Sequence, residues 1–228
     1  MTNTMKTLIF IASMFVFIGI YTLISTVITA FAATIPAFAL FALYAAFLVI
    51  AYIAALYSQA LIKYKYTEKK LKSAEIALKL PLSPFKFNER LVAYVLPALA
   101  VFVPMFSGNP MSPGSIISVA SLIILIIIVE LLFYLNSKRM HVYITNKGIA
   151  IMGTDIRFEL GLPLNYTNLS GFYPYERIDN FLAFPDRVII YQLFDYNVVT
   201  IMCSAEESTI IKGLMMKNHV EEKKNQGV

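Results

Sequence analysis

The sequence predicts an integral membrane α-helical protein with four spans, followed by a small cytoplasmic β-rich domain of about six strands and a C-terminal helix. Long apolar runs fill the chain before residue 140, and after His141 apolar residues alternate with polar ones. A run of about 20 apolar residues crosses the hydrocarbon core of a bilayer, whereas alternation is typical of a strand with one buried face. We therefore expect a transmembrane domain at residues 1–139, a β-domain at 140–219 and a flexible tail at 220–228.

The composition favours the same class of protein. Hydrophobic residues make up 58% of the 228 residues and charged residues only 14%, below the roughly 25% charge of soluble domains. Basic residues outnumber acidic ones before residue 140 but not after it. We interpret the net charge of +5 as a membrane-orientation signal, and not as nucleic-acid binding, because no basic face interleaved with aromatic residues occurs.

The basic residues also predict an orientation. They cluster in the segment 63–90 and again at Lys138 and Arg139, whereas the two short segments on the opposite side carry no charge. Lysine and arginine accumulate in short cytoplasmic loops, so we expect both termini in the cytoplasm of a multi-pass cell-membrane protein. The predicted spans are residues 7–33, 37–62, 91–106 and 115–136, with a break at Thr34-Ile35-Pro36.

The segment 63–90 is predicted to contain one helix over residues 67–80. Glu68/Lys72 and Glu75/Lys79 are correctly oriented i,i+4 pairs, and Pro81 follows. Such a helix could lie on anionic lipid headgroups or serve as a solvated connector. The candidate headgroup contacts are Lys69, Lys70, Lys72 and Lys79.

Glu130 is the one ionisable residue inside a predicted span, which makes it a candidate functional residue. It lies about two turns from the inner end of its helix, and Arg90 enters the neighbouring span at the same depth. We expect a structural ion pair between Glu130 and Arg90. A proton or cation site at Glu130 is the alternative.

The second half of the chain shows strand and turn patterns. A hairpin is predicted over residues 141–152, turning at Asn146-Lys147-Gly148, and a loop over residues 161–174. Ser204 and Glu207 form a capping-box pattern that opens a helix ending near residue 218. The further predicted strands are residues 156–160, 175–183, 188–194 and 198–203.

This arrangement resembles the pleckstrin-homology-like domains of prokaryotic membrane proteins. The matching stretches are Tyr143-Ile-Thr-Asn-Lys-Gly-Ile149, Tyr175-Glu-Arg-Ile178, and residues 198–203 leading into the capped helix. The resemblance covers roughly residues 140–219. It implies a module for protein interaction or self-assembly, with either an unknown protein or further copies of the chain as the partner.

A second, shorter resemblance points to a different class. The stretch Glu75-Ile-Ala-Leu-Lys-Leu-Pro-Leu-Ser83, followed by Phe85-Lys-Phe87 and a new span, is similar to the cytoplasmic coupling segment of type-2 ABC permeases. In those permeases a glutamate-containing helix leads into a Leu-Pro-x-Ser sequence. The alternative function is therefore the membrane subunit of a transporter.

The sequence offers little for catalysis or metal binding. The two histidines, His141 and His219, have no second ligand at metal-binding spacing, and the single cysteine, Cys203, is predicted to be a small buried hydrophobe. Glycine-rich phosphate loops and nucleophile motifs are missing from the sequence. We expect a non-enzymatic protein without a cofactor. Asn165 and Asn168 match the glycosylation pattern, which a cytoplasmic domain would leave unmodified.

Overall fold

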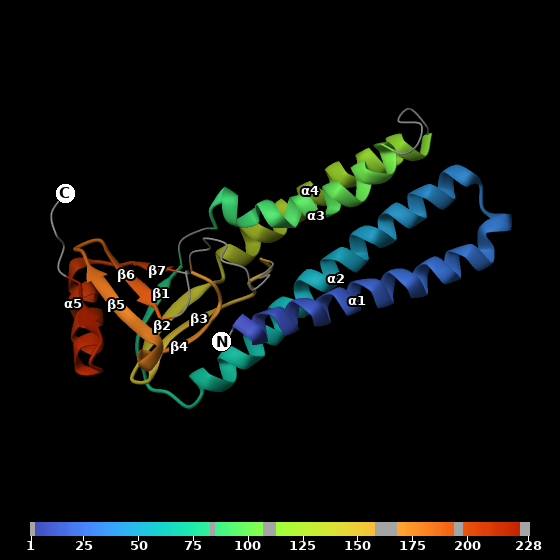
Figure 1. The fold of residues 1–228 in the computed structure, drawn as a ribbon. Coiled ribbons are helices and arrows are strands. Elements are labelled where there is room, and N and C mark those ends of the chain that lie inside the picture. The colour runs from blue at the N-terminus through green and yellow to red at the C-terminus, as the bar shows by residue number, and fades with distance from the viewer. Residues whose placement is uncertain (1–2, 83–84, 107–112, 158–167, 194–197, 224–228) are drawn as a thin grey trace.

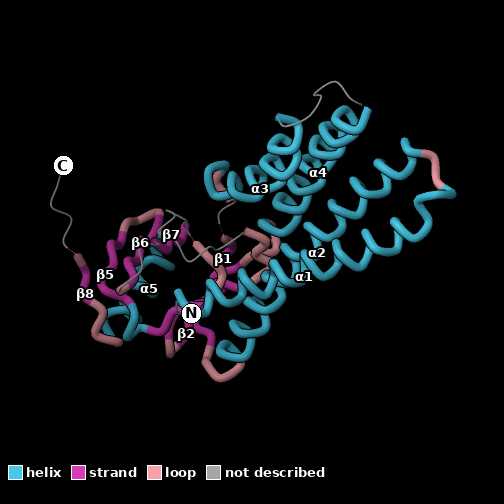
Figure 2. The backbone as a smooth tube through the Cα atoms, turned by 45° about the vertical axis from the view of Figure 1, so that its right-hand side comes forward, coloured by secondary structure: helices cyan, strands magenta, loops and turns pink. Residues whose placement is uncertain are grey.

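The computed structural model describes residues 3–82, 85–106, 113–157, 168–193 and 198–223. Two pairs of long helices leave a β-rich region at one end and diverge toward the other end (Figures 1 and 2). The first pair is α1 (Asn3–Phe31) and α2 (Ala37–Leu71), and the second is α3 (Phe87–Phe106) and α4 (Pro113–Ser137). The N-terminal end of α1 lies beside the β-rich region (Figure 1).

Among the described residues, three helical stretches are long and apolar enough to cross a membrane, namely Thr4–Phe31, Ala42–Leu71 and Val119–Ser137. The prediction of membrane-length helices is thus confirmed for three of the four predicted spans, and the predicted span at residues 91–106 is not among these stretches. The break between α1 and α2 also lies where the sequence predicts it. A short 3-10 turn (Ala32–Thr34) ends the first helix, and Pro36 stands directly before the second. Proline fits there because the first turn of a helix needs no backbone donor.

In its described residues, the β-rich region contains two four-stranded sheets and one α-helix. Sheet A has the order β1 (Ile76–Pro81), β2 (His141–Thr145), β3 (Gly148–Met152) and β4 (Gly171–Pro174), all antiparallel. Sheet B has the order β7 (Val198–Met202), β6 (Arg187–Gln192), β5 (Ile178–Ala183) and β8 (Glu221–Glu222). Helix α5 (Ala205–Lys217) follows β7.

The helices α3 and α4 stand between two adjacent strands of sheet A. Strand β1 precedes α3 in the chain, β2 follows α4, and the two strands pair from Pro81 opposite His141 to Ile76 opposite Thr145. The amide of Leu82 extends the pairing by donating to the carbonyl of Met140 at 3.1 Å. Sheet A is therefore built from two chain segments that the second helix pair separates.

One apolar core runs from the helices into the sheets. Leu56 of α2 and Phe133 of α4 belong to the same buried cluster as Ile144 of sheet A and Phe181 of sheet B. On its other face, sheet A is covered by the end of α2, where Leu71 packs against the cross-strand neighbours Ala150 and Phe172. The layers are thus the end of α2, sheet A and sheet B.

The predicted helix over residues 67–80 is wrong. Helix α2 continues only to Leu71, and residues 76–81 form β1. The i,i+4 pair Glu68–Lys72 does form, at 2.9 Å. Such a pair contributes only about 0.2–0.5 kcal/mol, which is less than the ladder to β2 and the burial of Leu80 in the core supply.

Four further expectations for the β-region need correction. Residues 171–174 of the predicted loop form β4, and residues 175–177 form a 3-10 turn before β5 begins at Ile178. Ile156 and Arg157, predicted to start a strand, lie in no strand, and the rest of that strand (158–160) is outside the described residues. In the predicted tail, β8 pairs in parallel with β5, while residues 224–228 are outside the described part.

Two local predictions are confirmed in detail. The β2–β3 hairpin turns at Gly148, whose φ of +148° and close approach to the backbone of Tyr173 leave no space for a Cβ atom. At α5 the Ser204 side chain accepts from the amide of Glu207, and the Glu207 carboxylate accepts from the amide of Ser204. This capping box fixes the start of the helix.

Candidate functional site: a buried charged junction

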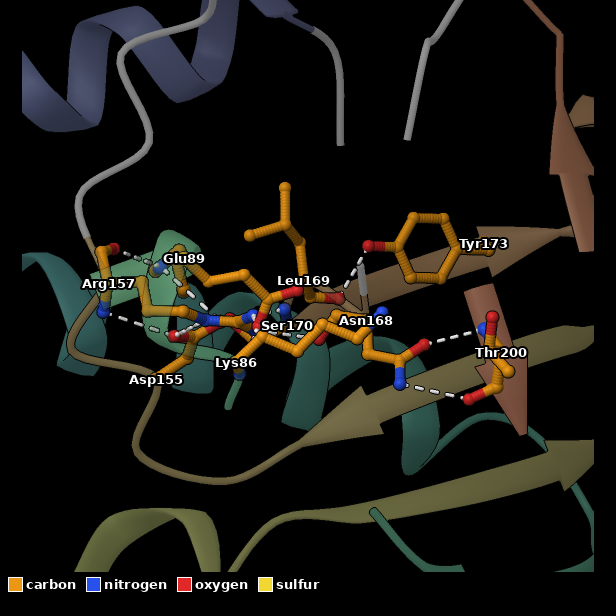
Figure 3. Close-up of polar contacts among 10 residues, drawn as sticks. Lys86, Glu89, Asp155, Arg157, Asn168, Leu169, Ser170, Tyr173 and Thr200 are labelled. Carbon is orange, nitrogen blue, oxygen red and sulfur yellow. Dashed lines mark hydrogen bonds and ion pairs between the residues drawn. The ribbon is translucent and has the colours of Figure 1, made fainter. Parts of the chain in front are cut away.

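Arg157 is the centre of a buried polar cluster between the helices and the sheets (Figure 3). Its side chain is 0% exposed, and its guanidinium donates from three nitrogens. Nε donates to Asp155 Oδ1 at 2.9 Å, and Nη1 to Glu89 Oε2 at 3.1 Å. Nη2 donates to Asp155 Oδ2 at 2.9 Å and to the carbonyl of Asn168 at 2.8 Å. Arginine suits this position because its planar fork matches several acceptors at once.

Asp155 receives hydrogen bonds on both carboxylate oxygens. Besides the two from the Arg157 side chain, Oδ1 accepts from the amide of Arg157 at 3.1 Å and Oδ2 from the amide of Ser170 at 3.0 Å. Burial by itself raises the pKa of this carboxyl, but the charges of Arg157 and Lys63, together with these hydrogen bonds, hold the pKa well below its usual range. Asp155 is therefore held as an anion that accepts hydrogen bonds on both oxygens.

The other two charges of the junction come from the helices. Lys63 of α2 places Nζ 3.9 Å from Asp155 Oδ2 and donates to the carbonyl of Arg157 at 3.3 Å. Glu89, in the first turn of α3, accepts from the amide of Lys86 at 3.1 Å as well as from Arg157. The ring of Phe85 lies 4.1 Å from the guanidinium carbon and gives a cation–π contact.

These four side chains carry two positive and two negative charges in a region without access to water. We call Lys63, Glu89, Asp155 and Arg157 the junction cluster. Buried charges are tolerated where they are paired and hydrogen-bonded, as these are. In the described part of the chain there is no group of three or more His, Cys, Asp or Glu side chains that could hold a metal ion. The arrangement of the junction cluster fits attachment of the sheets to the helices.

Asn168 connects this junction to the edge of sheet B. Its side-chain amide donates to the carbonyl of Thr200 at 2.9 Å, and its side-chain carbonyl accepts from the amide of Thr200 at 2.7 Å. The side chain thus occupies the place of a further strand beside β7 and covers an otherwise open edge. Because this side chain is buried, it is not accessible for glycosylation. Asn165 lies outside the described residues.

The structure brings Arg90 and Glu130 together. Arg90 Nη1 lies 2.5 Å from Glu130 Oε2, and the hydroxyl of Tyr94 donates to the other carboxylate oxygen. The pair lies between α3 and α4 and is half-buried, with side-chain exposures of 22% and 39%. Each carboxylate oxygen of Glu130 thus accepts a hydrogen bond from a side chain of α3.

The lysines predicted to contact lipid headgroups lie at two places. Lys69 and Lys70 are exposed in the last turn of α2, and Lys72 caps that helix. Lys79 lies instead in β1, where its Nζ is 5.6 Å from the ring centre of Tyr143. Contact of these four residues with lipid stays a prediction.

The remaining candidates also have local roles. His141 pairs with Pro81 at the start of the β1–β2 ladder, and His219 follows α5 with a φ of +60°. Cys203 is half-buried, and desolvation, followed by the neighbouring carboxylate of Glu207, raises its thiol pKa. A thiol with a raised pKa is a weak nucleophile.

The junction cluster cannot be recognised from the spacing of its residues in the sequence. Its members are separated by 68 residues between Glu89 and Arg157 and by 94 between Lys63 and Arg157. The one available signal was the pair Asp155 and Arg157 beside Ile156, where opposite charges interrupt an apolar stretch. No protein-family model, curated protein or solved structure matches the chain.

Proposed function

We propose that the chain is a four-span membrane protein with both termini in the cytoplasm. We further propose that its β-region is a cytosolic pleckstrin-homology-like domain that mediates protein interaction or self-assembly and carries no catalytic activity. The three membrane-length helices support the membrane part of this proposal. The α3 helix, which pairs with α4 and begins beside Lys86, supplies the fourth span.

The order of elements supports the domain assignment. Two antiparallel sheets share one core, and a C-terminal helix closes it through Ile211 and Met215. This is the arrangement that the resemblance to pleckstrin-homology-like domains implies. Its stretch Tyr143–Ile149 coincides with the β2–β3 hairpin, and residues 198–203 coincide with β7 and the residue after it.

The observation that carries the function is the way the β-region is attached. Strand β1 comes shortly before α3 in the chain, and β2 begins four residues after the end of α4. The junction cluster connects α2 and α3 to the loops of the β-region. A domain attached at three helices has a fixed position at the inner membrane surface. A fixed position suits a module that presents its outer surface to partners.

Labelling of single cysteines tests the topology. In a Cys203→Ser background, we expect Pro110→Cys to react with an impermeant thiol reagent from outside. Lys70→Cys and Asn225→Cys should react only after permeabilisation. External labelling of Asn225→Cys in intact cells would overturn the proposed orientation.

Purification from native membranes after mild crosslinking tests the function. We expect the chain to be recovered with a protein partner or with further copies of itself. The matched control carries Arg157→Met, which disrupts the junction cluster and should reduce recovery while the helices remain inserted. Recovery of a nucleotide-binding subunit would support the transporter alternative, and recovery of the chain alone as a monomer would contradict the proposal.

A further inference from the structure

Helix α5 has an outer face that carries apolar side chains. Its inner face is fixed to the sheets, because Ile211 and Met215 are buried in the core. On the outer face, Ile210 is 43% exposed and Met216 is 56% exposed. A helix at the surface of a domain normally presents charged and polar residues on the side opposite to its buried stripe. Packing within the chain therefore does not explain the apolar residues on this face.

Four residues of the outer face lie in one line along the helix. Their spacing of four, three and four positions places them within an arc of about 60° at about 100° per residue. The same spacing defines the contact line of a coiled coil, along which the side chains of one helix pack against another helix. We call these exposed residues the α5 seam: Glu206, Ile210, Gly213 and Lys217.

Gly213 leaves a gap in the middle of the α5 seam. Glycine is a poor helix former, because it loses more conformational freedom on folding than any other residue. A Cβ atom at this position would meet no atom within 4 Å, so packing inside the described chain does not require glycine here. The gap lies beside the exposed side chain of Ile210. A gap and a bulky side chain on one seam allow two helices to interlock at short distance.

The charges at the ends of the seam indicate which helix covers it. Glu206 lies in the first turn of α5 and Lys217 in the last turn. Among the described residues neither forms an ion pair, whereas Lys212, which lies off the seam, pairs with Glu222 at 2.8 Å. An antiparallel copy of α5 that places its residue 213 opposite residue 210 also places its residue 217 opposite residue 206, because both pairs have the same midpoint. The α5 seam is thus complementary to itself in shape and in charge.

We propose that the α5 seam packs in antiparallel orientation against the α5 seam of a second copy of this chain. In this dimer Ile210 of each copy fills the gap at Gly213 of the other copy. Glu206 of each copy pairs with Lys217 of the other copy. Both contacts occur twice, as an isologous two-fold interface requires. This inference rests on the proposed function and names its partner.

The contact between two α5 helices is small. With 13 residues, α5 is about 20 Å long at ~1.5 Å per residue. One pair of such helices buries less than the ~800 Å² per partner of a standard interface. The contact is therefore weak between free molecules. It becomes effective because anchoring in one membrane raises the local concentration of copies.

The direction of α5 is compatible with two copies in the same membrane. Such copies share their orientation, so the two-fold axis that relates them runs along the membrane normal. An antiparallel helix pair around this axis has to lie across it. In Figure 1, α5 lies at the margin of the β-rich region and runs across the direction of the long helices, as this symmetry requires.

Disulfide formation between two differently tagged copies tests the register. In a Cys203→Ser background, one copy carries Ile210→Cys and the other Gly213→Cys, and both are produced in the same cells. Mild oxidation of native membranes should join them, because the two positions face each other in the proposed dimer. The matched control combines Ile210→Cys with Met202→Cys, an apolar position on β7 that is 46% exposed. We expect about tenfold less disulfide in the control.

Gly213→Leu tests the gap. Leucine is a better helix former than glycine and has space at this position, so the thermal stability of the single chain should not fall. The leucine side chain would keep the two helices apart. The fraction of Ile210→Cys copies joined by a short bifunctional thiol reagent should therefore fall about tenfold. Gly213→Ala is the control, because it gives a similar gain in helix propensity with a smaller side chain and should lower the fraction less.

An exchange of charge tests whether the partner is a second copy. A chain with Glu206→Lys is positive at both ends of the seam, and a chain with Lys217→Glu is negative at both ends. Each variant alone should crosslink to itself about fivefold less through Ile210→Cys, because like charges then meet twice. The two variants together should crosslink to each other as well as the parent does. Thermal unfolding of each purified variant verifies that it remains folded.

Each other outcome decides against a stated part of the proposal. Equal disulfide yields with Gly213→Cys and Met202→Cys would overturn the α5 contact and leave self-assembly through another surface. Unchanged crosslinking in Gly213→Leu, or no recovery when the two charge variants are combined, would do the same. Crosslinking of Ile210→Cys to a different protein would overturn the second copy as partner and leave the interaction function. A monomer with no crosslinked product and no recovered partner would overturn both proposals.

Discussion

Glu89 and Arg90 are neighbours at the start of α3, yet their side chains enter two different charged environments. Glu89 is 3% exposed and pairs with Arg157 in the junction cluster. Arg90 points to α4 and pairs with Glu130, and this pair is half-buried. The same chemistry, a carboxylate and a guanidinium, thus occurs twice at one helix end with different burial.

The difference in burial determines what each pair contributes. Charges without access to water depend entirely on their protein partners, so removal of one partner leaves an uncompensated charge that costs about 3–5 kcal/mol. A half-buried charge keeps part of its contact with the surroundings of the protein, which limits the cost. The junction cluster should therefore be essential to the fold, and the α3–α4 pair should only support it.

Arg157→Met should have the largest effect. It keeps the apolar stem but removes every donor that Asp155 and Glu89 receive from the guanidinium, so we expect a loss of about 3–5 kcal/mol in the free energy of unfolding. Thermal or denaturant unfolding in detergent measures the loss. Arg187→Met, at a site where the arginine side chain is 44% exposed, serves as the control and should cost less than about 1 kcal/mol. Equal losses in the two variants would contradict the contrast in burial.

The pH dependence of unfolding should distinguish the two regions further. The folded-state pKa of Asp155 is lowered, so this group contributes stability that is fully present above its unfolded pKa of about 3.9 and is lost as the pH falls through the folded value. Stability should therefore decrease steeply below about pH 4. In Asp155→Asn this part of the decrease should be missing, and an unchanged profile would show that Asp155 is not the responsible group.

The sequence was informative wherever a structure depends on neighbouring residues. The proline break before α2, the turn at Gly148 and the capping box at Ser204 each rest on a few adjacent residues, and each is present. Arg90 and Glu130 could be placed together because the two predicted spans that carry them share a common depth scale. The position of a residue along a predicted span gives its depth in the bilayer, and the sequence of a soluble domain offers no comparable reference.

No such reference was available for the residues of the junction cluster. Lys63 looked like one more loop lysine, and Glu89 like a first-turn acid of a span. They become buried because β1 brings the chain back to the sheet and because the loop at Asp155 packs against the helices. Both contacts join segments that are far apart in the sequence. The pairing of β1 with β2 also overrode the local helix signal at residues 67–80. Strand pairing depends on a distant partner, here 64 residues along the chain from Lys79 to Tyr143.

The α3–α4 pair should give an intermediate effect in a double-mutant cycle. Glu130→Gln should be mild, because an amide still accepts from Arg90 and Tyr94. Glu130→Leu leaves Arg90 without its partner, and Arg90→Leu added to it should recover part of the loss, with a coupling of about 1–2 kcal/mol. Detergent stability of the four proteins measures it. Strictly additive effects would favour a proton or cation role for Glu130.

The smallest effect is expected for Glu68 and Lys72, the exposed pair at the end of α2. Their ionic atoms lie 2.9 Å apart, close to the 2.9 Å between Arg157 and Asp155, but their side chains are 34% and 74% exposed. Solvent screening reduces such an i,i+4 pair to about 0.3–0.5 kcal/mol, and the residual should vanish in high salt. A Glu68→Gln and Lys72→Met cycle, measured in low and high salt, tests this. A coupling as large as that at Glu130 would mean that distance, and not burial, sets the strength of ion pairs in this chain.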